Sequence, residues 1–477
     1  MTTRTLVILV VGVVLAGQVS DSVDLADAAP ASAPESHERV RLAQAAESAA
    51  VERSTKAPAP TQATAEESGA AQSPAARQAG TTRPTEEEGE PAPSPIKALL
   101  GHASAAFEAG GYERVIELAS RAIDLDPGNV NAYILRGQAY GEGRQDYERA
   151  IADLATINRL APSLADAWGN RGWYLILLGR WREAQEVTAR ARALDPNYFA
   201  WTINLGHAYL LQGNREQAQY WYRRALTLVP DEASLRSGPL ADFDLFIERG
   251  WQVAAARAER DWFVTGWAEW QTLEALNADV LDDYRAARYE QGITRAREGL
   301  ARAERLLGSA HPEVAKHLNN LAALLRITGQ YAEAEPLYRR ALAIDEQTKG
   351  PDHPDVARDH NNLAVLLRTT GRYAEAEPLY RQALAIYEQV RGPDHPDVAS
   401  ALNNLAFLLR TIGRYAEAES LYRRAVAIDE QAYGPDHLDV AADLNNLALL
   451  LRTTGRYAEA EPLYRRALAI DEQALGS

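Results

Sequence analysis

The chain has 477 residues, of which 46% are hydrophobic and 24% charged, and it contains no cysteine. A chain of this composition can bury a large apolar core, and the lack of cysteine excludes a disulfide-stapled scaffold, a Cys-ligated metal and a Cys-nucleophile enzyme. The 66 acidic residues exceed the 50 basic ones, which gives a net charge of −16. Because this charge repels polyanions, it argues against nucleic acid as the main partner.

The first 95 residues contain two segments that differ from the rest of the chain. Residues 1–16 combine an early positive charge, Arg4, with a short apolar run, LVILVVGVVLA. This is typical of a secretory signal peptide and is shorter than the ~20 residues of a membrane span. We expect cleavage after Ala16 and export to the periplasm or the cell exterior, with no direct membrane binding afterwards; an uncleaved anchor is the alternative. Residues 17–95 are rich in Ala, Pro and Glu and are predicted to be a disordered spacer.

Prolines punctuate residues 96–231 at a nearly constant interval of 34 or 35 residues, at Pro127, Pro162, Pro196 and Pro230. Small residues recur within the units, at Gly137, Gly172 and Gly206, where they allow two helix axes to approach closely. This period and these small residues resemble the tetratricopeptide repeat, a helix–turn–helix unit of 34 residues. We therefore predict four such units in residues 96–231.

Residues 232–268 fit no clear repeat and are predicted to be a helical, Trp-rich connector. The apolar spacing of Leu240, Phe243, Phe246 and Ile247 predicts one amphipathic helix. The neighbouring tryptophans form either a ligand-binding cluster or a junction core that seals two unlike arrays: Trp251, Trp262, Trp267 and Trp270.

Residues 269–477 contain a second array, whose copies are nearly identical and are spaced by 42 residues. The copies begin at His311, His353, His395 and His437, and an additional, degenerate copy precedes them, with a recognisable second helix but an unrecognisable first one. The motifs LNNLA, YAEAEPLYRRAL and GPDHPDVA recur in them. These five units resemble the long tetratricopeptide repeats of kinesin light chain and its bacterial relatives. The fold class predicted from both arrays is all-α: a superhelical solenoid of about nine helix–turn–helix units.

The sequence shows no catalytic constellation, so we predict a non-enzymatic protein with no cofactor. There is no Gly-rich phosphate loop and no nucleophile elbow. The four histidines that begin the long copies each stand near an acidic residue. Their repeat spacing places them about 10 Å apart, too far to share one metal ion. We interpret them as a repeated helix-entry turn, and no metal site is predicted.

The functional prediction rests on polar residues of the first helix of each long unit, expected on the concave face of the superhelix. Asn offers both a donor and an acceptor for the backbone of an extended peptide, and Arg binds carboxylates through two parallel hydrogen bonds. The resemblance implies the same use, because peptide-binding relatives employ groove asparagines and basic residues in these roles. The predicted peptide-binding residues are Asn320, Asn362, Asn403, Asn404, Asn446, Arg326, Arg368, Arg410 and Arg452.

A structural alternative remains open for the same residues, in which each Asn bonds between helices and each Arg pairs with a Glu of a neighbouring unit. The preferred function is a protein–protein interaction scaffold or adaptor that binds extended or acidic peptide segments in the groove. The alternative is a structural subunit of an envelope or secretion complex, which acts by end-to-end stacking. Apolar residues on the last helix predict self-association or docking of a partner helix there: Leu463, Ala467 and Ile470.

Overall fold

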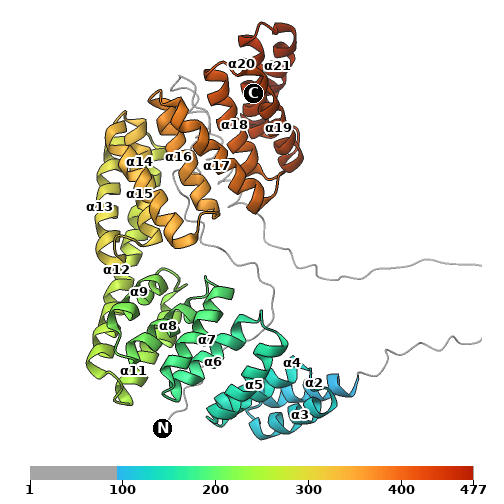
Figure 1. Ribbon diagram of the computed structural model, residues 1–477, viewed down its shortest axis with the longest axis vertical. Coiled ribbons are helices and arrows are strands. Elements are labelled where there is room, and N and C mark those ends of the chain that lie inside the picture. The colour runs from blue at the N-terminus through green and yellow to red at the C-terminus, as the bar shows by residue number, and fades with distance from the viewer. Residues whose placement is uncertain (1–93, 476–477) are drawn as a thin grey trace, which may run out of the picture. The chain divides into compact units, whose positions relative to one another are not determined.

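The computed structural model describes residues 94–475, whose regular structure is helical throughout and forms successive antiparallel helix pairs (Figure 1). This confirms the all-α solenoid predicted from the repeats. The expected signal peptide and nearly all of the expected spacer lie outside the described residues. The first helix, α2, begins at Pro95, with the Ser94 hydroxyl accepting a hydrogen bond from the Lys97 backbone N–H. No described helix combines the length and the apolar character that a membrane crossing requires.

The described residues divide into two compact units between Phe263 and Val264. Within the N-terminal unit, the first helix of each pair (helix A) is followed by a tight turn and the second (helix B). The helices are α2 (Pro95–Glu108), α3 (Tyr112–Leu125), α4 (Val130–Gln138), the π-helical turn η1 (Ala139–Gly143), α5 (Tyr147–Leu160), α6 (Ala165–Leu177), α7 (Trp181–Leu194), α8 (Phe199–Leu211), α9 (Arg215–Leu226), α10 (Glu232–Leu235), the π-helical turn η2 (Arg236–Leu240) and α11 (Ala241–Glu248).

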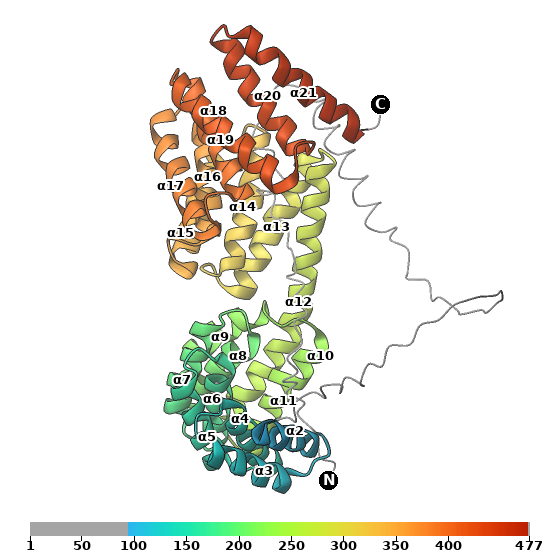
Figure 2. The same ribbon diagram turned by 90° about the vertical axis from the view of Figure 1, so that its right-hand side faces the viewer.

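The C-terminal unit contains the long repeats, in which helix B has 19 residues. Its helix pairs follow one another in chain order in both views (Figures 1 and 2). They are α13 (Tyr289–Leu307), α14 (Pro312–Ile327), α15 (Tyr331–Lys349), α16 (Pro354–Thr369), α17 (Tyr373–Arg391), α18 (Pro396–Thr411), α19 (Tyr415–Tyr433), α20 (Leu438–Thr453) and α21 (Tyr457–Leu475).

The turn between helix A and helix B has a residue at positive φ in every pair. In residues 94–475 these residues are Gly110, Gln145, Gly179, Gly213, Gly250, Ala287, Gly329, Gly371, Gly413 and Gly455. The series includes Gly250, which lies inside the segment expected to be a connector. That segment therefore contains a helix–turn–helix of its own, and the sequence missed it because no proline spacing marks it.

One long helix, α12 (Val253–Arg285), serves both as the helix B that follows Gly250 and as the helix A that precedes Ala287. Its 33 residues include no proline and only Gly266 as a glycine, so nothing in the sequence interrupts the helix. The degenerate long copy thus has its first helix in the last part of α12. There the buried Asp283 accepts hydrogen bonds from Arg288 and Arg295, at 2.7 and 2.5 Å, where later copies have an apolar residue.

The connector tryptophans do not form a single cluster. The Trp251 ring contacts those of Phe246 and Trp181, whereas the Trp262 ring contacts that of Phe263. Two phenylalanines expected on the amphipathic helix, Phe243 and Phe246, are fully buried. These contacts place the connector aromatics in the ordinary packing between helices.

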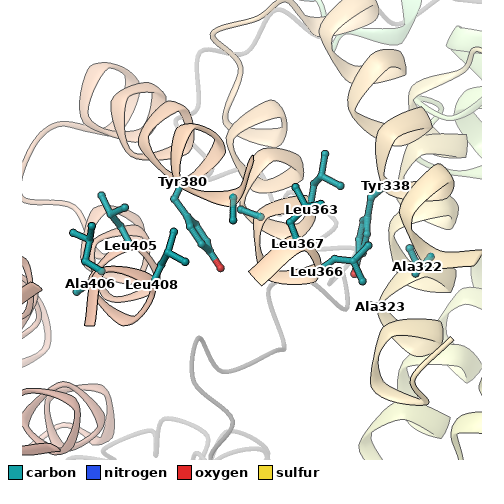
Figure 3. Close-up of a cluster of buried hydrophobic side chains, with 14 of the residues drawn as sticks. Ala322, Ala323, Tyr338, Leu363, Leu366, Leu367, Tyr380, Leu405, Ala406 and Leu408 are labelled. Atoms are coloured by element: carbon teal, nitrogen blue, oxygen red, sulfur yellow. The ribbon is translucent and has the colours of Figure 1, made fainter. Parts of the chain in front are cut away.

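Consecutive long units are joined by a tyrosine of helix B. Tyr338 and Tyr380 are 1% and 0% exposed, and each ring lies between the A helices of two successive units (Figure 3). Tyr380 extends from α17 between the leucines of α16 and those of α18. The N-terminal unit uses the same device at Tyr222, and a Cβ added to Gly206 would lie only 2.4 Å from its ring. Gly172 is equally tight, with Thr188 only 2.1 Å from an added Cβ, so these two small residues of helix A are needed for close packing.

Ion pairs also join consecutive long units. An Arg at the A–B turn binds a Glu of the preceding helix B, with the same N–O distance of 2.7 Å in three places: Arg372 with Glu335, Arg414 with Glu377 and Arg456 with Glu419. Each of these arginines also pairs with the Glu three residues later. The arginines that form these ion pairs between units are thus not those predicted to bind a ligand.

Candidate functional site: the A-helix face of the long repeats

Each of the A helices α14, α16, α18 and α20 begins at a histidine that caps it. The Nδ1 atom of His353 accepts a hydrogen bond from the backbone N–H of Asp355 at 3.1 Å, and His311, His395 and His437 make the same bond at 3.1–3.3 Å. These bonds satisfy a backbone donor that a helix start leaves free. Among residues 94–475, no group of three or more His, Asp or Glu side chains is arranged to hold a metal ion.

The asparagine pairs in the middle of each A helix connect consecutive units. Asn319 donates from Nδ2 to Asp359 of the next A helix at 2.7 Å, and Asn403 donates to Asp443 in the same way. Where the next A helix has no Asp at that position, its own asparagine donates the hydrogen bond back to the preceding A helix. Asn320 then donates to Asn277 of α12, and Asn404 donates to Asn361, both at 2.9 Å.

These bonds correct the prediction that all five asparagines of the candidate site face a ligand. Asn320, Asn403 and Asn404 are 1%, 7% and 3% exposed, and their amide groups already bond a neighbouring unit. A peptide could use them only by breaking a contact that holds the array together. The sequence signal for this role was the residue two positions before each pair, which alternates between a carboxylate and other types: His317, Asp359, Ala401 and Asp443.

Asn362 and Asn446 differ from the other three predicted amides, because both are only half-buried. The Nδ2 atom of Asn362 has no hydrogen-bond partner within the described part of the chain. In the short repeats, Asn204 occupies the corresponding place and is 7% exposed. Asn362 and Asn446 are therefore the two predicted asparagines that are not almost fully buried, although the Asn362 Nδ2 atom itself is buried.

The four predicted arginines form what we call the arginine row: Arg326, Arg368, Arg410 and Arg452. Each lies in the last turn of its A helix, where the helix dipole favours a positive charge. Successive A helices pack directly against each other, so the four last turns follow one another along the unit. Arg326, Arg368 and Arg410 are half-buried, and Arg452 is exposed. Across residues 94–475, none of the four makes an ion pair.

The centre of the row is a stacked arrangement on Phe407. The guanidinium carbons of Arg368 and Arg410 lie 4.2 and 4.8 Å from the centre of the Phe407 ring. Such contacts hold a guanidinium in place through the ring quadrupole and leave its N–H edge free. Other units have a smaller or aliphatic residue at the equivalent position: Ala323, Val365 and Leu449.

Two buried tyrosine hydroxyls lie beside these arginines. Burial raises the pKa of Tyr380 to about 12, and the charges of Arg368 and Arg326 oppose this rise. Burial likewise raises the pKa of Tyr422 to about 12, against the charges of Arg410 and Arg368. The Tyr380 hydroxyl has no hydrogen-bond partner among the residues described. We call these helix-B tyrosines, which include Tyr338, the wedge tyrosines. Tyr380 and Tyr422 therefore reach from helix B to the arginine row.

Comparison with known proteins places these features in a family. Models described as "Tetratricopeptide repeat" match residues 165–198, 200–236, 272–347, 313–389, 359–431 and 397–473, which together make up more than half of the chain. The chain belongs to the tetratricopeptide repeat family. The first long-repeat match begins at residue 272, within α12, and so includes the degenerate copy.

Individual relatives of this tetratricopeptide repeat protein are distant. A kinesin light chain protein of nearly identical TPR-like repeats from Podosopora anserina is 24% identical, with a TM-score of 0.38, and the match covers 43% of this chain and 98% of that one. BtubC (BKLC) from P. vanneervenii is 23% identical, with a TM-score of 0.39 and coverage of 50% and 92%. Anaphase-promoting complex subunit cut9 of Schizosaccharomyces pombe is 22% identical over 130 residues, which are 27% of this chain and 19% of that protein. The match thus spans about a fifth of that curated relative.

Proposed function

We propose that this protein is a non-enzymatic scaffold that binds an extended acidic segment of a partner protein along the arginine row. Tetratricopeptide repeats generally mediate protein–protein interaction, and the row gives that role a chemical preference. The observation that carries the proposal is the set of four aligned guanidinium groups with no ion pair in the described residues, in a chain with a net charge of −16.

The contrast with the structural arginines supports this proposal. The turn arginines and most helix-B arginines of the long repeats are paired with Glu at 2.5–2.8 Å. These arginines therefore join units through a carboxylate, whereas Arg368 contacts the next unit through the Phe407 ring. Unpaired, partly buried cations favour an anionic ligand, because its oxygens accept hydrogen bonds from N–H groups that burial has removed from water.

The proposal predicts the effect of reversing two charges in the row. A fluorescein-labelled peptide of six Glu-Ser pairs presents all its carboxylates on one side when extended, since successive side chains point to opposite faces. We expect the full-length protein to bind it, and Arg368→Glu/Arg410→Glu to weaken binding at least tenfold in fluorescence anisotropy. Binding of the unaltered protein should also weaken with added salt.

A matched control separates the row from overall charge. Arg305→Glu/Arg465→Glu makes the same change in net charge at exposed positions of helix B. We expect it to change the affinity less than twofold, with unchanged helicity by circular dichroism in both double variants. Equal losses in the two variants, or no binding of the peptide at all, would exclude the row as the binding site.

A second candidate, the end-to-end contact, is favoured by the outer face of α21. The residues predicted to be open there do not form this face, because Ala467 and Ile470 are 0% and 3% exposed and pack with Leu463 against α20. Leu468 is 56% exposed, whereas residues at its position in earlier units pack against the next A helix: Leu342, Leu384 and Val426. Glu461 and Glu472 occupy positions at which Glu419 and Glu430 bind arginines of the following unit. This face therefore fits an Arg-bearing hairpin of the same repeat type better than a second copy of itself, which would oppose like charges.

The second candidate predicts that a synthetic hairpin of residues 353–391 binds the full-length protein. It contains Arg372 and Val356, which make the equivalent contacts within the array. We expect Leu468→Glu to weaken this binding at least tenfold, and Leu125→Glu, at a leucine 59% exposed in the other unit, to leave it unchanged. If the hairpin does not bind, or binds Leu468→Glu equally well, the end-to-end contact is ruled out.

A further inference from the structure

Two guanidinium groups of the arginine row are held close together without a compensating charge. Both Arg368 and Arg410 stack on the Phe407 ring, and the two distances limit the separation of their guanidinium carbons to about 9 Å. Neither arginine makes an ion pair in residues 94–475. The Nη1 atom of Arg368 and the Nε atom of Arg410 are buried and have no hydrogen-bond partner among those residues.

This arrangement occurs once along the row, between α16 and α18. It depends on an aromatic ring that both guanidinium groups can contact, and Ala323, Val365 and Leu449 offer none at the same position. The completely buried Tyr422 lies beside both arginines, whose charges act on its hydroxyl. Arg368, Phe407 and Arg410 therefore converge on one part of the A-helix face, which we call the double-arginine site.

We propose that the double-arginine site binds the phosphate of a phosphorylated side chain within the bound segment, an inference that rests on the proposed function. A phosphate monoester carries a charge of −1.5 to −2 at neutral pH and three acceptor oxygens. It can accept hydrogen bonds from two guanidinium forks at once, whereas one carboxylate neutralises only one of them. Arginine clusters that recognise phosphorylated residues use this same chemistry.

The phosphate proposal makes the α16–α18 contact the anchor of the ligand. Stacking on Phe407 fixes the two planar groups before binding, so less conformational freedom is lost when the phosphate arrives. The remaining members, Arg326 and Arg452, then contact carboxylates on either side. A lysine in place of either stacked arginine would keep the charge but lose the two-pronged hydrogen bonds and the stacking.

The test compares three forms of the Glu-Ser peptide with the full-length protein: unmodified, phosphorylated at one central serine, and with Glu at that serine. We expect the phosphorylated form to bind at least tenfold more tightly than the Glu form. Arg410→Lys and Phe407→Leu should each reduce this ratio to less than threefold. The matched controls are Arg452→Lys, in the same row, and Val365→Leu, at the position equivalent to Phe407; both should leave the ratio unchanged.

The outcomes separate this inference from the function on which it rests. Binding of the unmodified peptide with equal affinities for the phosphorylated and Glu forms refutes the phosphate site and leaves the acidic groove intact. A ratio that survives in Arg410→Lys and Phe407→Leu places phosphate recognition elsewhere and also refutes the inference. Inorganic phosphate should compete only at millimolar concentration; competition in the micromolar range would assign the site to free phosphate instead. Failure of all three peptides to bind contradicts the proposed function itself.

Discussion

Replacing Tyr380 by alanine is expected to lower the free energy of unfolding of the C-terminal unit by about 3–5 kcal/mol. The ring is fully buried between the leucines of α16 and α18, so its removal leaves a cavity that two helices border (Figure 3). Because each unit of a solenoid is stabilised by its neighbours, the loss should also uncouple the helices on either side. Urea unfolding followed by circular dichroism measures the first effect, and amide hydrogen exchange in α16–α18 measures the second.

Two substitutions control this result. Tyr380→Phe keeps the ring and removes a buried hydroxyl with no hydrogen-bond partner in the described residues, so it should be neutral or stabilising by up to about 1 kcal/mol. Tyr464→Ala removes the equivalent residue of α21, which is only half-buried, and should cost less than half as much. If Tyr464→Ala lowered the free energy of unfolding as much as Tyr380→Ala, burial of the tyrosine ring between two A helices would not be the source of the coupling.

Raising the pH is expected to destabilise the contact between α19 and α20. There, burial raises the pKa of Asp429 to about 6, with repulsion from Asp439 adding to the rise, and burial together with repulsion from Asp429 raises the pKa of Asp443 to about 8. An unfolded Asp titrates near pH 4, so between about pH 4 and 8 the folded state holds more protons than the unfolded one. The free energy of unfolding therefore falls as the pH rises through this window. We expect Asp443→Asn to remove much of this slope and to add on the order of 2 kcal/mol at pH 9.

The contact between α15 and α16 suggests how the pair could be neutralised. At the equivalent positions, Asp345 and Asp359 lie near Lys349 and Arg358, whereas the last contact has Tyr433 and Ala442 in place of these cations. Ala442→Arg should therefore also stabilise the protein at alkaline pH. Asp436→Asn, at an exposed loop residue, is the control and should change neither the stability nor its slope. A pH profile that stays the same in Asp443→Asn would show that the pair does not hold its proton.

The candidate site divided into a part that the sequence predicts and a part that it does not. The repeat period places Asn and Arg on the same helix, and sequence alone left both a binding role and a structural role open for each. The structure assigns Asn320, Asn403 and Asn404 to contacts between units, because Asn277, Asp443 and Asn361 lie within hydrogen-bond distance of them. Arg368 and Arg410 contact the Phe407 ring and no carboxylate in residues 94–475. The side chain that lies opposite in the next repeat unit therefore decides whether a predicted residue has a structural role or can bind a ligand.

The sequence by itself determined the helical class and the repeat period. These follow from local chemistry: the apolar period, the histidine caps and the small residues where helices approach. Only the tertiary structure decided how each contact between units is satisfied, since three successive contacts place Asp345, Tyr387 and Asp429 at one position. It also revealed that α12 is helix B of one helix pair and helix A of the next. Such features depend on residues about 40 positions apart, whose pairing is fixed by packing and is not encoded in any local pattern.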